Sequence, residues 1–239
     1  MREHSAFLLL TELDETTMPA LQERMAVAKA AVLPPRSYPG YPTWPLKPVR
    51  PRWRKSLDGA LLERRCVRSL GQDTPSRSSL SRVLYSSHGA TREFSSGPTP
   101  SAGGLQALEL YLVHWNDAWL PRGLYHYDRR AHLLAQISPN ASRSEWRRLI
   151  PSLMPVDGGA LAWVVVGDEP RVAAKYGDRA SRFLLLEAGH LMQNLCLLSA
   201  SLGLATVPLG GCLDREIADA FQLQATDWVL YAGVCGRMV

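Results

Sequence analysis

Residues 181–203, SRFLLLEAGHLMQNLCLLSASLG, are the longest stretch of helical character in this chain of 239 residues. The stretch ends at Gly203, a residue that suits the position after a helix, so we predict a helix over 181–202. It is apolar almost all round, which indicates a central, buried helix. One stripe is polar, because Glu187, His190 and Asn194 share a face, with Gln193 beside them. Buried polar groups need partners, so this stripe predicts a polar network, a subunit interface or a ligand.

Shorter elements surround this helix. The apolar run ALAWVVVG at 160–167 predicts a strand buried on both faces. Further strands are predicted at 108–115, 123–128, 132–137 and 228–234, and further helices at 58–65, 78–87, 144–150 and 214–222. Helices and strands intermix without a regular alternation, so we predict the α+β class.

The first 56 residues differ from the rest. A helix is predicted over 16–33, and prolines then recur at every third position from Pro39 to Pro51. Three residues make one turn of a polyproline II helix, so these prolines would share one edge. We interpret residues 1–56 as a helix with a stiff surface linker, or as an arm that wraps a partner subunit or a peptide. Residues 57–239 would form the compact domain.

Composition narrows the class of protein. Hydrophobic residues make up 46% and charged residues 21%, the balance of a globular protein. No apolar run approaches the roughly 20 residues that cross a bilayer, so we expect a cytoplasmic protein without a membrane partner. The four cysteines form no C-x-x-C pair, and we expect no metal.

Basic residues concentrate in one segment. Residues 47–68 hold eight Lys or Arg against two acidic residues, although the whole chain carries a net charge of only +5. This segment could meet a phosphate, an acidic peptide or solvent. No nucleic-acid motif accompanies it, so we expect no nucleic-acid partner. Phosphate-binding loops of the NTPase and Rossmann types and a G-x-S-x-G nucleophile elbow are also missing.

Six short motifs follow one another from residue 64 onward. They are Arg64-Arg65-Cys66-Val67-Arg68, Pro100-Ser101-Ala102-Gly103-Gly104 with Glu109-Leu110-Tyr111, Gly123-Leu124-Tyr125-His126-Tyr127-Asp128, Lys175-Tyr176-Gly177-Asp178-Arg179, Glu187-Ala188-Gly189-His190 with Gln193-Asn194, and Gly203-Leu204 with Pro208-Leu209-Gly210-Gly211. In this order they resemble the SagB-type (azoline) dehydrogenases of the FMN-dependent nitroreductase-like family. The resemblance covers residues 57–239.

That resemblance implies a fold and a cofactor. We expect a central, mostly antiparallel sheet flanked by helices, with a long central helix and FMN at a homodimer interface. Arg64, Arg65 and Arg68 would supply charge for the FMN phosphate and flavin oxygens. Cys66 stands where the family usually has Ser, and it is grouped with these cofactor-binding residues. The chain also stops soon after Gly236-Arg237, where many family members continue with a basic segment.

Two glycine-rich segments complete the expected cofactor site. Pro100, Ser101, Ala102 and Gly103 have little side-chain bulk, so their backbone could approach the flavin ring closely. Leu209, Gly210 and Gly211 could bring a backbone N–H toward flavin N5. For both segments, a tight turn without a ligand is the alternative. The EAGH helix is interpreted as core and dimer packing, rather than as direct cofactor contact.

Lys175 and Tyr176 are the expected catalytic pair, because the resembling family uses Lys-Tyr here as acid and base. Oxidising an azoline ring removes a proton from carbon and a hydride to flavin N5, and a desolvated lysine can take that proton. The alternative is a solvated Lys-Tyr in a loop.

The expected activity is the oxidation of thiazoline or oxazoline to thiazole or oxazole in a peptide natural product, with a possible cyclodehydratase partner. Two other functions stay open. One is an NAD(P)H-dependent nitro or quinone reductase on the same fold. The other is a non-enzymatic scaffold subunit of a peptide-modifying complex.

Overall fold

The structure is a computed structural model that describes residues 7, 11–12, 14–27, 35–48, 55–92 and 96–239. The predicted helix over 16–33 appears as α2, Met18–Val27, and the remainder of that prediction lies outside the described residues. Pro51, the last proline of the periodic stretch, also lies outside them.

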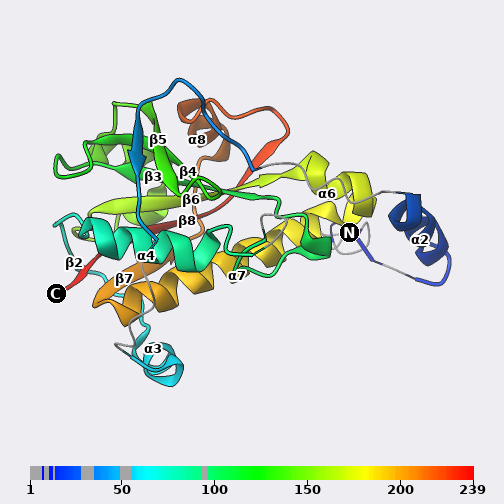
Figure 1. Ribbon diagram of the computed structural model, residues 1–239, viewed down its shortest axis with the longest axis horizontal. Helices are drawn as coiled ribbons and strands as arrows, with labels where there is room; N and C mark the ends of the chain where they lie inside the picture. The colour runs from blue at the N-terminus through cyan, green and yellow to red at the C-terminus, as the bar shows by residue number, and fades with distance from the viewer. Residues whose placement is uncertain (1–6, 8–10, 13, 28–34, 49–54, 93–95) are drawn as a thin grey trace.

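One antiparallel sheet forms the centre of the molecule (Figure 1). Its order is β1-β5-β4-β3-β6-β8-β2, and β7 also pairs with β8. The strands are β1 Thr43–Pro45, β2 Leu70–Gly71, β3 Leu108–His114, β4 Gly123–Asp128, β5 Leu133–Ser138, β6 Leu161–Asp168, β7 Leu204–Leu209 and β8 Asp227–Met238. The α+β class and the antiparallel sheet predicted from the sequence are confirmed.

Helices cover both faces of this sheet. The helices besides α2 are α3 Leu57–Glu63, α4 Arg77–His88, α5 Arg143–Leu149, α6 Glu169–Tyr176, α7 Ala180–Ser201 and α8 Asp214–Ala220. Short 3₁₀ turns occur at Ala102–Gly104, Pro151–Leu153 and Gly177–Arg179. Strand β3 shows how the layers form: Leu108, Leu110 and Leu112 pack toward α4 and α7, while Tyr111 and Val113 pack toward α5 and α8. Both faces are therefore buried, as the apolar strands predicted.

Helix α7 crosses the molecule beneath the sheet and buries Leu184, Leu191 and Leu195. The helical stretch Glu169–Ser201 is apolar and long enough to span a bilayer by length and composition, but half of its most apolar window is buried inside the protein. The opposite face is exposed in the single chain, where Leu185 and Leu186 keep 49% and 54% of their surface accessible. Two exposed leucines on a core helix mark a surface that another chain could cover.

The proline-rich segment runs along the sheet. Trp44 pairs with Leu134 of β5, and the backbone hydrogen bonds Gln136 N to Pro42 O and Leu46 N to His132 O flank this pair at 2.9 and 3.0 Å. The sequence predicted a linker or a wrapping arm and gave no indication of this strand. Three-residue proline spacing hides the strand, because it masks the two-residue alternation of an edge strand.

Candidate active site

Helix α6 carries both predicted catalytic residues. The Asp168 carboxylate accepts a hydrogen bond from Arg171 N at 3.3 Å, and Pro170 lies in the first turn, so a cap and a proline start the helix. Gly177 ends it in the left-handed region, at φ 54°. Lys175 and Tyr176 thus lie in the last turn of a helix, and the alternative of a loop is wrong. The cap and the proline were the signals that could have predicted α6.

The fold brings Lys175 and Tyr176 against the predicted glycine-rich loop, Pro100–Gly103. A Cβ on Gly103 would lie 2.6 Å from the Tyr176 hydroxyl and 2.8 Å from Lys175 Nζ. Gly103 has φ +59°, which favours glycine. Tyr176 is buried, and its ring packs on Phe183 with centroids 4.7 Å apart. Two segments more than 70 residues apart therefore form one site, with the Lys175 side-chain nitrogen and the Tyr176 hydroxyl against exposed backbone.

Glu187 of α7 bonds the same loop. Its Oε1 accepts hydrogen bonds from Ala102 N at 2.6 Å and from Ser101 Oγ at 3.0 Å. Burial raises the pKa of Glu187 to about 7, although these two hydrogen bonds and the charge of Arg129 lower it. Asn194, one residue of the same predicted stripe, donates to Thr99 Oγ1 at 3.1 Å. Glu187 and Asn194 of the predicted polar stripe thus bond the loop and Thr99 beside it, whereas His190 and Gln193 are exposed.

A buried arginine supports this loop from behind. Arg129 donates to His88 O at 2.9 Å and to Gln106 Oε1 at 2.6 Å. Gln106 N in turn donates to Ser101 Oγ at 2.8 Å. Arg129 falls between the predicted strands at 123–128 and 132–137, and its role in supporting the loop was not predicted. No local signal separates it from the neighbouring Arg130, which is exposed.

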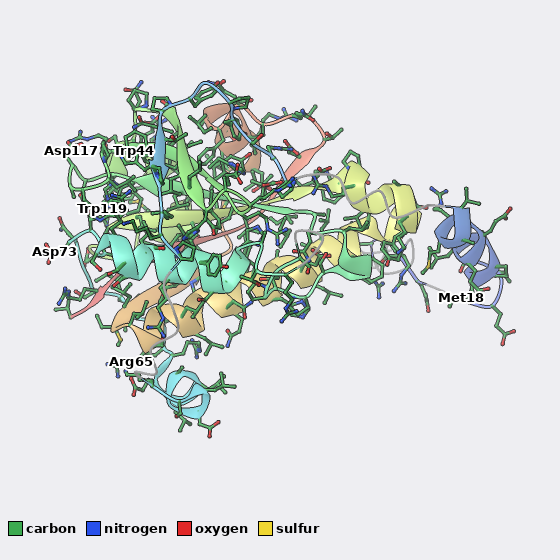
Figure 2. All side chains as sticks on the ribbon, viewed as in Figure 1. Met18, Trp44, Arg65, Asp73, Asp117 and Trp119 are labelled. Carbon is green, nitrogen blue, oxygen red and sulfur yellow. The ribbon has the colours of Figure 1, made fainter. Side chains whose placement is uncertain are left out.

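Residues 64–68 follow α3 without regular secondary structure, in a different region. Arg65, Cys66 and Arg68 are exposed, and Arg64 is half-buried. Figure 2 labels Arg65 beside α3, near the C-terminal end of α7, whereas α6 lies toward the other end (Figure 1). Asp157 N donates to Arg68 O at 2.8 Å, which fixes the end of the segment. Within one chain, the arginines and Lys175 do not come together.

The third predicted cofactor-binding segment, residues 209–211, begins at the last residue of β7. Leu209 is buried, and Gly210 and Gly211 are exposed. Gly211 N donates to Ser152 Oγ at 3.0 Å, and Ser152 Oγ donates to Gly211 O at 3.0 Å. The Gly211 N–H is therefore engaged within the protein. A Cβ on Gly210 would meet nothing within 4 Å, so the open position is at Gly210.

The N-terminal segment packs beside the catalytic pair. Arg179 donates to Thr11 O, and Arg182 donates to Thr11 Oγ1 at 2.6 Å. A cavity of about 330 Å³ lies between α2 and the end of α6, and Arg24 and Tyr176 are among its lining residues. Figure 2 labels Met18 on this side of the molecule. Residues outside the predicted domain therefore shape the surroundings of Tyr176.

The protein has an α+β fold with one antiparallel sheet between helices, and comparison with known proteins gives its family. A model described as "Nitroreductase family" matches residues 61–237, so the chain belongs to the nitroreductase family. A Methanocaldococcus jannaschii protein named "Putative nitroreductase MJ1384" is 29% identical over 168 residues, which are 70% of this chain and 85% of that protein.

Solved structures share the fold. A "putative nitroreductase" from Ralstonia eutropha JMP134 matches with a TM-score of 0.73 and 24% identity, over 86% of this chain and 94% of that one. The E. coli microcin synthetase McbBCD complex with truncated pro-MccB17 bound contains a chain that matches with a TM-score of 0.60 and 22% identity, over 67% of this chain and 63% of that one. An Exiguobacterium sibiricum family member in complex with FMN has a TM-score of 0.55 and 14% identity, over 77% and 89%.

Proposed function

We propose that this protein is an FMN-dependent dehydrogenase that oxidises thiazoline or oxazoline rings in a peptide to thiazole or oxazole. The observation that carries the proposal is the contact of Gly103 with Lys175 and Tyr176. A reductase that only transfers electrons does not need a lysine and a tyrosine hydroxyl placed together as an acid/base pair. An enzyme that removes a proton from carbon needs such a pair.

The residues of this chain fit FMN. The exposed guanidinium groups of Arg65 and Arg68, with Arg64 behind them, would hold its phosphate. The Pro100–Gly103 backbone and the Gly210 N–H would face the flavin ring, since both glycines are exposed and Gly210 has open space around it. Other structures of this fold bind FMN, as the Exiguobacterium sibiricum protein does.

A complete site needs a second copy of the chain. The arginine segment and the catalytic pair lie toward opposite ends of α7 (Figure 1). A helix of 22 residues is about 33 Å long, so one chain does not bring both groups to one ligand. A homodimer joined along the exposed face of α7 would place the arginines of one protomer near Lys175 of its partner. The exposed Leu185 and Leu186 support this interface.

Each residue then has a chemical task. Bound FMN would accept the two electrons that the ring loses. Lys175 would take the ring proton, because its amine lies in a half-buried position against Gly103 rather than in open solvent. Tyr176, buried beside it, would donate or relay a proton through its hydroxyl. Oxygen or a partner protein would reoxidise the flavin.

The similarity to a chain of the microcin synthetase complex supports a peptide substrate and a biosynthetic partner such as a cyclodehydratase. A synthetic peptide that contains one azoline ring tests the proposal. The protein loaded with FMN should lower the peptide mass by two hydrogen atoms, and the azole chromophore should appear. If the loaded protein leaves an azoline peptide unchanged with and without a cyclodehydratase, the proposal is wrong.

The name of the Methanocaldococcus jannaschii relative favours a second candidate, a nitro or quinone reductase driven by NAD(P)H. Turnover of a nitroaromatic compound with NADPH, together with no azoline oxidation, would select this function. A protein that stays colourless after incubation with FMN and gel filtration would contradict both enzymatic functions and favour a scaffold role.

A further inference from the structure

Glu187 is a buried carboxyl group that the proposed chemistry does not use. Only 4% of the residue is exposed. Burial of a carboxyl group is costly unless hydrogen bonds compensate for it. Both bonds to its Oε1 come from the loop that precedes Gly103, one from the Ala102 backbone and one from the Ser101 hydroxyl.

The loop transmits the position of Glu187 to the catalytic pair. Ala102 and Gly103 are neighbours, so their Cα atoms lie about 3.8 Å apart. A Cβ on Gly103 would lie 2.6 Å from the Tyr176 hydroxyl and 2.8 Å from Lys175 Nζ, so both groups lie close to the Gly103 backbone. A shift of Ala102 toward or away from α7 therefore moves the surface on which these two groups rest.

Other hydrogen bonds hold the far end of the loop. Gln106 N donates to Ser101 Oγ, and Gln106 is itself held by Arg129 and, through its carbonyl, by Arg171 of α6. The turn bonds of Gly104 N and Leu105 N close the turn on itself, whereas Glu187 ties Ser101 and Ala102 directly to the longest helix of the protein. Loss of Glu187 would leave the turn and the Gln106 anchor intact, but would free Ser101 and Ala102 to move relative to Lys175 and Tyr176.

We propose that Glu187 is a positioning residue for the dehydrogenase reaction: it holds the Ser101–Gly103 backbone at the distance from Lys175 and Tyr176 that the reaction requires. The inference rests on the proposed function. Glu187 touches neither the expected substrate nor the reacting atoms. What it contributes is an acceptor oxygen, which is present in the ionised and in the protonated carboxyl group alike.

Three variants separate this role from general stability. Glu187→Ala removes the acceptor, and Glu187→Gln keeps an acceptor oxygen but removes the charge. Ser199→Ala is the matched control, because Ser199 is a buried polar residue of the same helix that bonds Thr206 at 2.8 Å, away from the loop. All three are compared as full-length proteins by amide hydrogen exchange without FMN, and by steady-state kinetics with FMN and an azoline peptide.

In Glu187→Ala, exchange at Ala102 should rise by about tenfold, because its N–H loses its acceptor. The kcat should fall by about 10²-fold, the effect of a displacement of about 1 Å, with KM changed much less. Glu187→Gln should restore slow exchange and most of kcat. Ser199→Ala should lower Tm without altering exchange at Ala102 or kcat.

Unchanged exchange at Ala102 in Glu187→Ala would overturn the inference, as would faster exchange with an unchanged kcat. A proportional loss of kcat in Ser199→Ala would also overturn it, because the effect would then be one of stability. If wild-type protein does not oxidise azolines, the proposed function and the catalytic part of the inference fail together. The exchange measurement still decides, separately, whether Glu187 holds the loop.

Discussion

Arg36 and Asp227 form a bidentate ion pair, with Nη1 to Oδ2 at 2.8 Å and Nη2 to Oδ1 at 2.7 Å. The Asp227 side chain is 1% exposed. Arg36 also donates through Nη1 to the Tyr111 hydroxyl at 3.1 Å, and its backbone N–H donates to Glu109 Oε1 at 3.2 Å. A residue of the predicted arm is thus bonded to β3 and to the first residue of β8.

Arg36→Ala is expected to destabilise the protein by about 3 kcal/mol, because the variant leaves the Asp227 carboxylate buried without its partner. Urea denaturation measures the change in the free energy of unfolding. The double variant Arg36→Met/Asp227→Leu should recover much of the loss, since it removes both charges. An equally unstable double variant would mean that packing of the arginine side chain, not the ion pair, stabilises the folded protein.

Gly103→Ala should abolish most activity. Its methyl group would enter the space of the Tyr176 hydroxyl and the Lys175 amine. Gly104→Ala is a close control, because Gly104 also has a positive φ, +70°, but nothing within 4 Å of a Cβ. Both variants carry similar backbone strain, so a difference in kcat/KM reports the contact alone. Equal losses would show that strain, not contact with the pair, limits the site.

Lys175→Ala should lower the rate of azole formation by about 10²- to 10⁴-fold, the usual contribution of a general acid or base. Flavin absorbance and circular dichroism should match those of the wild type, since Lys175 is not expected to bind the phosphate. Arg24→Ala, on the neighbouring wall of the cavity, is the comparison for a change of charge nearby. A wild-type rate in Lys175→Ala would remove the catalytic assignment.

Arg64→Ala/Arg68→Ala should raise the Kd for FMN by at least about tenfold, because charge-assisted bonds to a phosphate are lost. Fluorescence quenching of FMN on binding measures this. Arg148→Ala, an exposed arginine of α5, should leave the Kd unchanged. Affinity that is equally weakened by Arg148→Ala would indicate a general effect of surface charge, and the loss should then vanish at high salt.

Glu187→Gln should change how stability depends on pH. The pKa of Glu187 is raised by burial from 4.5 to about 7, so the folded protein retains a proton that the unfolded chain loses. Its stabilising contribution is complete below about pH 4.5 and disappears as the pH rises to about 7. Relative to wild type, Glu187→Gln should gain up to about 1.4 kcal/mol per pH unit across this window. Urea denaturation at a series of pH values provides the test, and parallel curves would contradict it.

Much of the fold could be predicted because hydrophobic periodicity is local. The strand at 160–167 and the helix at 181–202 appear within a residue or so as β6 and α7. Strand β1 could not be predicted, because its pairing depends on β5, about 90 residues away, and its prolines resemble those of a linker. Core and dimer packing was predicted for α7 as a whole, but not which of its leucines are exposed, because Leu185 and Leu186 resemble buried leucines in the sequence.

The candidate site was predictable in part. The motifs identified the three segments, and the structure adds which of them meet. Gly103 and Lys175 come together through sheet geometry that no local pattern encodes. Gly211 was predicted as a backbone donor for the ligand, but its N–H bonds Ser152, which lies 59 positions earlier. Arg129 and Glu187 support the loop through tertiary contacts alone.

The proline-rich segment also determines whether this edge of the sheet can pair with another strand. The backbone groups of β1 that face β5 are paired with it, which leaves those of Thr43, Pro45 and Lys47 facing outward. Pro45 has no N–H, its carbonyl accepts from Arg77, and the Lys47 carbonyl accepts from the Ser81 hydroxyl. An incoming strand therefore finds few donors or acceptors there. This edge of the sheet is therefore protected against pairing with a second copy, in agreement with the proposal that two copies meet along α7.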